Sequence, residues 1–188
     1  NLRNESINKL VDQIEFYIKR LKVKSFLFRD PVFTINRKRV IDICNEIIKR
    51  KIKIVWGAEL HLKDIDSELA RIMAKAGLRI VFVGIESINP ESIIKTKRQN
   101  APTDKQLSSI KILEKNGISV KAMFIFGFPG DNLKNALNTI SYALSLPITY
   151  LQFSVFTPYP GTPIFSEYKD KITAKNYEEY TQWGLVFK

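Results

Sequence analysis

The stretch VFVGIESINPESIIKTKR, residues 81–98, begins as an apolar run typical of a buried strand and then places a carboxylate, Glu86, directly at the exit of that run. A lone exposed glutamate would need no explanation, because most glutamates are solvated. Four other apolar runs also finish in polar or Gly/Pro-rich exits: SFLFRD (25–30), KIVWGAE (53–59), KAMFIFGFPGD (121–131) and LQFSVFTPYPGTP (151–163). The repetition of this pattern needs one structural cause.

Length and composition fit one globular domain with a sizeable core. The chain has 188 residues, of which 45% are hydrophobic and 11% aromatic, so we expect a single domain over residues 1–188. The longest apolar runs, about seven residues, are far shorter than the roughly 20 residues that span a bilayer. The first ten residues contain no signal-peptide hydrophobic region, and we therefore expect a cytoplasmic protein.

Net charge and cysteine content limit the kinds of partner and of covalent cross-link that this chain could have. The net charge of +11 favours anionic partners such as nucleotides, RNA or acidic lipid. The lysines are scattered, however, without a dense basic tract or an RNA-binding aromatic signature, which favours ordinary solvated helix faces. Cys44 is the only cysteine, so it excludes an intrachain disulfide and is expected to be a small core residue. His61, the only histidine, is expected to be structural or to lie on the surface.

Helix and strand signals alternate along the chain. Apolar residues at helical spacing predict a helix over residues 5–22. Start and stop signals predict four more helices, which are opened by Asn36, by Asp64 or Ser67, by a capping box of Thr103 and Gln106, and by Asp131. Gly77, Asn116-Gly117 and Pro147 end the last three of these. The predicted strands are 25–29, 53–58, 79–85, 118–126 and 149–156.

This order of elements predicts an α/β fold. Between 27 and 41 residues separate successive strand exits, which is the length of a βα unit. Near-continuous apolar strands indicate a parallel sheet that helices cover. A barrel-like curved sheet and a flat doubly wound sheet both fit, and in both of them ligands bind at the carboxyl ends of the strands. Glu86 is therefore predicted to be a site residue.

Several strings resemble, in order and spacing, the core domain of radical S-adenosylmethionine (SAM) enzymes. They are RDPVFT (29–34), GAE (57–59), AGLRIVFVGIES (76–87), TKR (96–98), FIFGFPGD (124–131) and TPYPGTP (157–163). The resemblance covers nearly the whole chain and is strongest to the subgroup whose members often carry an N-terminal cobalamin-binding domain. It implies a partial (β/α) TIM-like barrel, with about five strands in an open curved parallel sheet that is a fragment of a (β/α)6 barrel.

The resemblance also implies an enzyme in the full-length form. Such an enzyme binds SAM against a [4Fe-4S] cluster, which supplies one electron and generates a 5′-deoxyadenosyl radical. Cobalamin would be held by a separate domain, and the substrate would be small or lipid-like. Methyl transfer or related C–H chemistry would fit this subgroup.

Residue by residue, the resemblance implies nine cofactor contacts. Glu86 matches the acceptor of the ribose hydroxyl groups, and Arg98 matches the cation that meets the methionine carboxylate. Glu59 matches a polar contact to the ribose or the amino-acid part. Of the other six, Asp30 would hold the amino group, Ile125 would contact adenine, Thr157 and Pro158 would lie at the adenine edge, Gly127 would allow close backbone approach, and Ser87 completes the GIES string.

Three of these roles have a simpler alternative. Glu59 could pair with a neighbouring Lys or Arg, Arg98 could be merely solvated, and Ile125 could serve the core alone.

One defining feature of the family is absent. The CxxxCxxC motif, whose three thiolates ligate three irons, does not occur in these 188 residues. The chain starts at the helix that would follow the cluster loop, so we expect the first strand and the cluster ligands to lie outside it. We also expect these residues alone to hold no cluster and to be inactive.

Two other functions stay open. A tRNA-modifying methylthiotransferase would explain the net charge of +11 but would need an RNA-binding domain, so nucleic acid is not the favoured partner. A non-catalytic βα nucleotide-binding scaffold would share the polar strand exits and would need no cysteines upstream.

Overall fold

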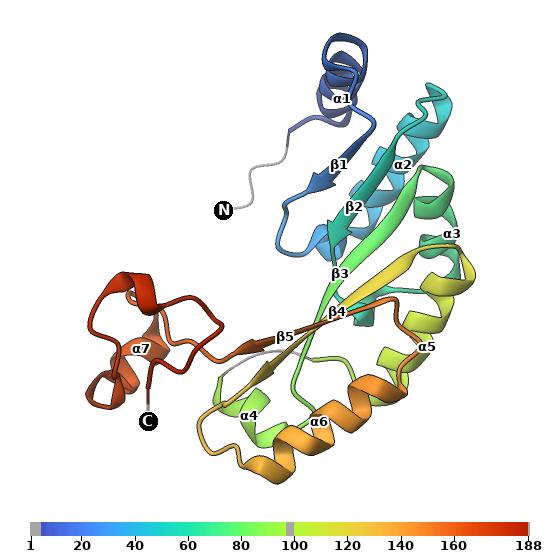
Figure 1. Cartoon of the computed structure of the whole chain (residues 1–188). Coiled ribbons are helices and arrows are strands. Elements are labelled where there is room, and N and C mark those ends of the chain that lie inside the picture. Colours follow the sequence, from blue (N-terminus) through green and yellow to red (C-terminus); the bar gives the residue numbers. More distant parts are fainter. Residues whose placement is uncertain (1–4, 97–99, 188) are drawn as a thin grey trace. The chain divides into compact units, whose positions relative to one another are not determined.

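The computed structural model describes residues 5–96 and 100–187 (Figure 1). Contacts between Cα atoms divide the chain into two compact units. The first unit comprises residues 1–83, 101–121 and 147–150, and the second comprises residues 84–100, 122–146 and 151–188.

The five predicted strands and the five predicted helices are present, and two short helices, α4 and α7, were not predicted. The strands are β1 (Ser25–Phe28), β2 (Val55–Glu59), β3 (Leu78–Glu86), β4 (Ser119–Phe126) and β5 (Tyr150–Val155). The helices are α1 (Ile7–Leu21), α2 (Arg37–Lys49), α3 (Ser67–Lys75), α4 (Pro90–Lys95), α5 (Thr103–Lys115), α6 (Leu133–Ser145) and α7 (Pro163–Glu167). None of the described helices is long and apolar enough to cross a membrane.

The five strands form one parallel sheet in the sequential order β1-β2-β3-β4-β5. Ser25 lies opposite Val55 and Phe28 lies opposite Ala58, which fixes the register of β1 against β2. The sheet does not close, because β1 and β5 stand at its two ends among the described residues. The predicted α/β fold with an open, five-stranded parallel sheet is therefore confirmed.

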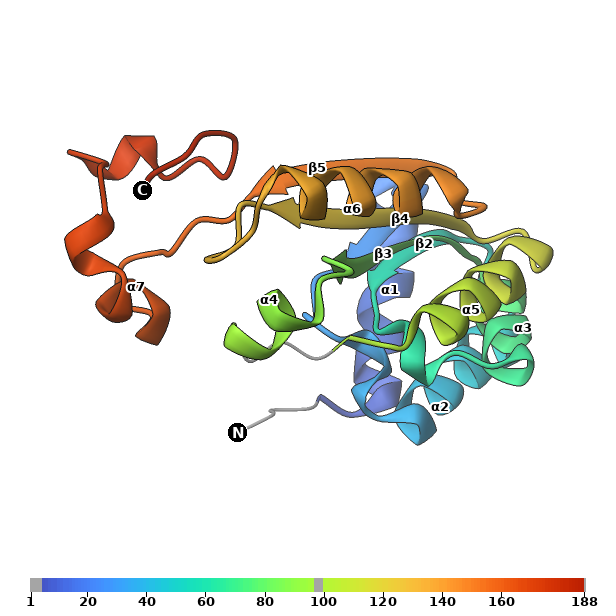
Figure 2. The same ribbon diagram turned by 90° about the horizontal axis from the view of Figure 1, so that it is seen from below.

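The core of the first unit lies between the sheet and its helices. Figure 2 shows α2, α3 and α5 on one side of β2 and β3. Trp56 of β2 is fully buried, and its indole Nε1 donates a hydrogen bond of 2.8 Å to the carbonyl of Ala76. The rings of Phe28 and Phe33 pack against Trp56 with centroid distances of 5.4 and 5.5 Å. Cys44 is also buried, as expected for a core residue.

In the second unit, aromatic side chains hold the ends of β4 and β5 together. Phe126 stacks on Phe153 with a centroid distance of 4.9 Å and an interplanar angle of 10°. Helix α6 differs from the usual amphipathic pattern, because Leu133 and Leu144 are 74% and 71% exposed whereas Thr139 and Ala143 are buried. The apolar stripe of this helix therefore faces away from the core.

Three predicted helix caps are wrong, although α3 begins at Ser67, one of the two residues predicted to open it. Asp66 caps α3 through a bond from the Leu69 N–H, so neither Asp64 nor Ser67 is the cap. The N-cap of α6 is Asn132, one residue after the predicted Asp131. Polar residues cluster before each helix, and only the backbone conformation selects which of them caps it.

The capping box of Thr103 and Gln106 is the third wrong prediction. Pro102 occupies the N-cap position of α5, and the Gln106 amide donates to the carbonyl of Ala101 at 2.6 Å. The fixed φ of proline prepares the helix start without a side-chain cap. The predicted caps at Asn36 and Gly77 are confirmed, because Asn36 accepts from the Arg39 N–H and Gly77 has a φ of +103°.

Candidate functional site

The polar exits of β1 and β2 meet in the first unit. Phe28 lies opposite Ala58 in the parallel register, which brings the next residues, Arg29 and Glu59, side by side. Arg29 NH1 lies 3.3 Å from Glu59 Oε1, with the arginine 74% and the glutamate 28% exposed. The simpler alternative for Glu59 is therefore present, although such an exposed pair contributes only about 0–1 kcal/mol. A cofactor could displace the arginine at little cost.

Asp30 is exposed beyond the end of β1. It lines a cavity of about 700 Å³ in the first unit, together with the backbone turn at Pro31 and Val32 and the side chains of Arg37 and Arg39. Arg37 is already bonded to Asp66 and Glu68, and this raises the pKa of the Arg37 guanidinium. One of the two arginines that line this cavity thus has acidic partners of its own.

Glu86 ends β3 in the second unit with an unusual backbone. Its φ of +65° is in the left-handed region, which residues with a Cβ atom rarely adopt. The side chain is half-buried, and its Oε2 atom is shielded from solvent. Val83 and Ile85 are buried, so alternation along the strand puts Gly84 and Glu86 on the opposite, open face. A carboxylate is therefore held, half desolvated, where β3 ends.

A hydrogen-bonded network fixes the segment after Glu86. The Asp131 carboxylate accepts from the Ser92 hydroxyl at 2.6 Å and from the Asn89 amide at 3.1 Å. Its second oxygen accepts from the Phe128 N–H at 3.1 Å. Asp131 thus joins α4 to the loop that follows β4, both in the second unit. Ser87 is buried, and its hydroxyl accepts from the Asn89 N–H at 3.0 Å.

The other predicted contacts of the second unit lie at the ends of β4 and β5. Ile125 is half-buried and occupies the strand face opposite to Ala122 and Phe124, which are buried. Gly127 has a φ of +75° and lines a cavity of about 410 Å³.

Thr157 and Pro158 follow β5 directly. The Thr157 hydroxyl donates to the carbonyl of Val155 at 3.1 Å, and Pro158 is buried. The side chain of Thr157 is thus occupied locally, which leaves its backbone as the predicted contact.

Arg98 lies outside the described residues. The predicted cleft formed by Glu59, Glu86 and Arg98, with Ile125 and Thr157 on its apolar wall, therefore stays a prediction.

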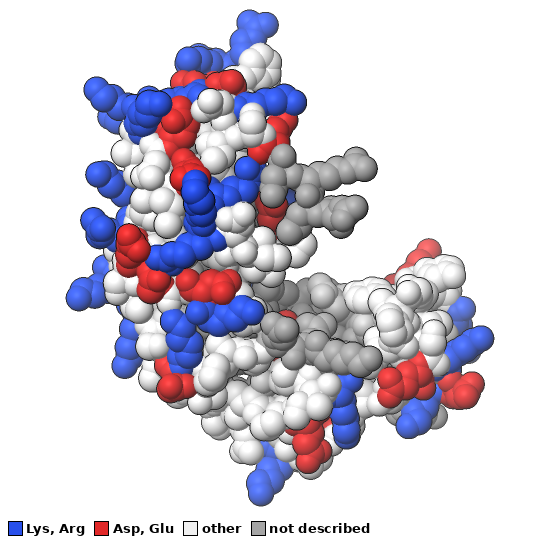
Figure 3. Space-filling view, turned by 180° about the vertical axis from the view of Figure 1, so that it is seen from behind, with Lys and Arg blue, Asp and Glu red and all other residues white. Residues whose placement is uncertain are grey.

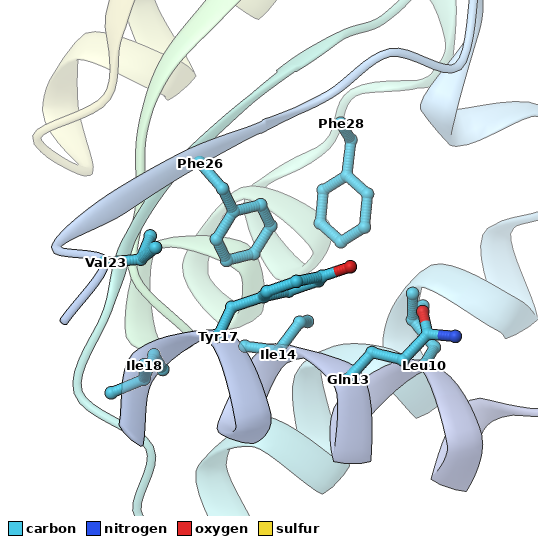
Figure 4. A pocket seen from close by; sticks show the side chains of 8 residues that line it. All are labelled: Leu10, Gln13, Ile14, Tyr17, Ile18, Val23, Phe26 and Phe28. Carbon is cyan, nitrogen blue, oxygen red and sulfur yellow. The ribbon is translucent and has the colours of Figure 1, made fainter. Parts of the chain in front are cut away.

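A second cavity, in the first unit, does not suit a charged cofactor. It measures about 360 Å³ and lies between α1 and β1. Figure 4 shows the rings of Phe26, Phe28 and Tyr17 and the aliphatic side chain of Ile14 facing it. Among the described residues that line it, only Gln13 and Tyr17 carry polar side-chain groups.

The positive charge does not gather into one patch on the face drawn in Figure 3, where Lys and Arg lie among acidic side chains. Arg50 illustrates this interleaving, since it bonds to Asp12, Glu15 and Glu46. His61 has a local role, because its Nδ1 accepts from the Lys63 N–H at 3.3 Å.

The residues present do not fit an iron–sulfur cluster. Such a cluster needs several thiolates, whereas the chain has one cysteine, which is buried on α2. Burial raises the pKa of the Cys44 thiol to about 12. Within residues 5–96 and 100–187, no group of three or more His, Cys, Asp and Glu side chains could hold a metal ion.

Sequence reasoning missed Asn89, Ser92, Asn100 and the role of Asp131. Asn89 followed by Pro90 is a helix-start signal that could have revealed α4. Asn100, by contrast, follows no spacing rule, and only the fold reveals its contacts.

Comparison with known proteins places these features in a family. The Radical SAM superfamily profile matches residues 1–143. An uncharacterized methyltransferase of Pyrococcus horikoshii is 30% identical over 99% of this chain and 41% of its own length. The anaerobic magnesium-protoporphyrin IX monomethyl ester cyclase of Rubrivivax gelatinosus is 30% identical over 92% of this chain and 31% of its own length.

A solved structure agrees in fold. The radical SAM methyltransferase TsrM of Kitasatospora setae, solved with cobalamin and a [4Fe-4S] cluster, aligns with a TM-score of 0.81 and 20% identity. The alignment covers 89% of this chain and 32% of that protein. The chain thus spans less than half the length of each of these three proteins. Because the family profile matches more than half of its residues, this chain belongs to the radical SAM superfamily.

Proposed function

We propose that this chain supplies the SAM-binding part of a radical SAM enzyme. The observation that carries the proposal is Glu86, a half-buried carboxylate held in a left-handed conformation where β3 ends. Two carboxylate oxygens suit the two hydroxyl groups of a ribose. Strained backbone at a strand end is typical of functional sites.

The other predicted residues complete the proposed SAM contacts. Glu59 and Asp30 would bind the polar end of the cofactor, together with Arg98, whose guanidinium suits the methionine carboxylate. Ile125 would cover the adenine ring, which the backbone at Thr157 and Pro158 would meet at its edge. Ser87 and Gly127 would shape the turns on which these contacts depend.

The cluster of the superfamily supplies an electron to bound SAM. Its thiolate ligands would have to come from residues outside this chain, because Cys44 is the only cysteine here. The task of these residues is to bind SAM, to orient it and to exclude water around it.

The reaction of the intact protein is proposed by analogy with the relatives. A methyltransferase and a cyclase are among them, and cobalamin is bound in TsrM. Our first candidate is therefore methyl transfer or related C–H chemistry on a small molecule, with cobalamin held by another domain. A lipid-like substrate and a cytoplasmic location stay predictions. The alternative of a tRNA methylthiotransferase rests on net charge alone, and Figure 3 shows that charge dispersed on the face it draws.

Substitution of Glu86 tests the proposal. In the intact protein that carries this chain, Glu86→Ala should weaken SAM binding by about 1–3 kcal/mol, because charge-assisted hydrogen bonds are lost. Equilibrium dialysis with labelled SAM under anaerobic conditions measures the affinity.

Glu91→Ala is the matched control, because Glu91 is an exposed glutamate on α4, five residues away. It should leave the affinity unchanged. Equal affinities for the wild-type protein and the Glu86→Ala variant would favour the non-catalytic scaffold instead.

A further inference from the structure

The backbone at Glu86 needs an explanation. Within the described residues, the other non-glycine residues with positive φ are Lys22, Lys51 and Gln182. Lys22 is the C-cap of α1 and Lys51 follows the C-cap of α2, and helix ends commonly use a left-handed residue. Glu86 ends a strand, where no such turn is required. Something else must hold this residue in an unfavourable conformation.

The side chain of Asn100 contacts the backbone on both sides of Glu86. Its Nδ2 lies 2.6 Å from the carbonyl oxygen of Ile85 and 3.3 Å from that of Ser87. An amide NH₂ group carries two hydrogens and can donate to both oxygens at once. The Ile85 carbonyl belongs to the peptide that sets φ of Glu86. Asn100 therefore restrains the rotation that gives Glu86 its left-handed backbone.

The carboxylate of Glu86 then turns back over Gly84. A Cβ atom built on Gly84 would lie 2.5 Å from Glu86 Oε1, so the carboxylate would have to move aside. Glycine at this position leaves the space that the carboxylate occupies. The side chain of Glu86 thus depends on its own backbone conformation and on the space that Gly84 leaves beneath the carboxylate. Both residues belong to the second unit.

We propose that Asn100 is a positioning residue, which holds Glu86 in the geometry that binds the ribose of SAM. This inference rests on the proposed function and deepens it, because it assigns SAM affinity to a residue outside the family's recognised strings. Asn100 acts through the two carbonyl groups that flank Glu86. Its effect should therefore depend on the presence of the Glu86 carboxylate.

A double-mutant cycle in the intact protein tests this dependence, with SAM affinity measured by equilibrium dialysis. Asn100→Ala should raise the Kd for SAM about tenfold when Glu86 is present, the size of effect expected from a lost hydrogen-bond pair. In the Glu86→Ala background the same change should have no further effect, which a general loss of structure would not produce.

Two further variants sharpen the experiment. Asn100→Asp keeps the side-chain shape but removes both hydrogen-bond donors, so it should raise the Kd for SAM as Asn100→Ala does. It therefore tests the inference if Asn100→Ala folds poorly. Asn116→Ala removes a comparable bond, from Asn116 Nδ2 to the Ile112 carbonyl at 2.8 Å, in the first unit. This control should leave the affinity unchanged.

The outcomes separate this inference from the proposed function. If Asn100→Ala weakens binding equally in both backgrounds, Asn100 acts independently of Glu86 and the inference is overturned. If Glu86→Ala weakens binding and neither Asn100 variant does, the inference fails while the proposed function stands. If Glu86→Ala itself changes nothing, both fail.

Discussion

At the scale of single residues, two glycines that end helices differ in what surrounds them. Gly77 follows α3 and Gly117 follows α5, with φ of +103° and +70°. A Cβ atom on Gly77 would lie 2.0 Å from the carbonyl oxygen of Ile54, whereas one on Gly117 would meet nothing within 4 Å. Replacing each glycine by alanine therefore separates the energetic cost of the left-handed backbone from the cost of a close contact.

We expect Gly117→Ala to lower the free energy of unfolding by about 1 kcal/mol, because alanine disfavours the left-handed region. Gly77→Ala should cost about 3 kcal/mol or more, since a clash with backbone adds to the same conformational strain. Urea unfolding followed by circular dichroism measures both. Equal losses of unfolding free energy in the two variants would show that the Ile54 backbone moves aside and that the close contact does not affect stability.

At the scale of elements, Asp131 links α4 to the loop after β4 through three hydrogen bonds. Asp131→Ala would leave the Ser92 hydroxyl, which is buried, without its acceptor. We expect a loss of about 2–3 kcal/mol in the free energy that keeps α4 closed, because buried donors to a carboxylate lose their partner. Hydrogen exchange of the backbone amides of residues 91–95 reports this opening, since Pro90 has no amide hydrogen.

Asp170→Ala is the control for Asp131, because Asp170 is an exposed aspartate in the same unit. It should change the exchange rates of α4 little. Unchanged protection of α4 in Asp131→Ala would mean that apolar packing, rather than the carboxylate, holds this helix.

The elements also show what the sequence could predict. Every strand was predicted to within two residues at each end, because an apolar run of strand length is a strong signal when each run is bounded by a polar exit. Helix starts were less certain, since Asp64, Asp66 and Ser67 carry the same capping chemistry. Helix α4 was missed because its six residues are too few to show a period.

The candidate site was predictable only in part, for a related reason. Glu86 could be predicted because it interrupts the apolar pattern at a strand exit. Its left-handed backbone is flanked by the contacts of Asn100 with Ile85 and Ser87, which are 15 and 13 positions away in the chain. No local sequence pattern encodes these contacts. Arg29 beside Glu59 follows from the strand register, which the sequence leaves open.

At the scale of the whole molecule, the proposed SAM-binding residues stand in a sequence with a single cysteine. We predict that they assemble no stable [4Fe-4S] cluster when incubated with iron and sulfide under reducing conditions. Iron–sulfur clusters are held mainly by thiolates, whereas Cys44 is fully buried and burial raises the pKa of its thiol to about 12. The absorption spectrum after desalting shows whether a cluster has formed, and the intact protein is the positive control. Cys44→Ala should give the same spectrum as the unaltered chain. A stable four-iron spectrum that disappears in Cys44→Ala would contradict the prediction, because it would show that the α2 core opens to expose its thiol and that ligands other than cysteine complete the cluster.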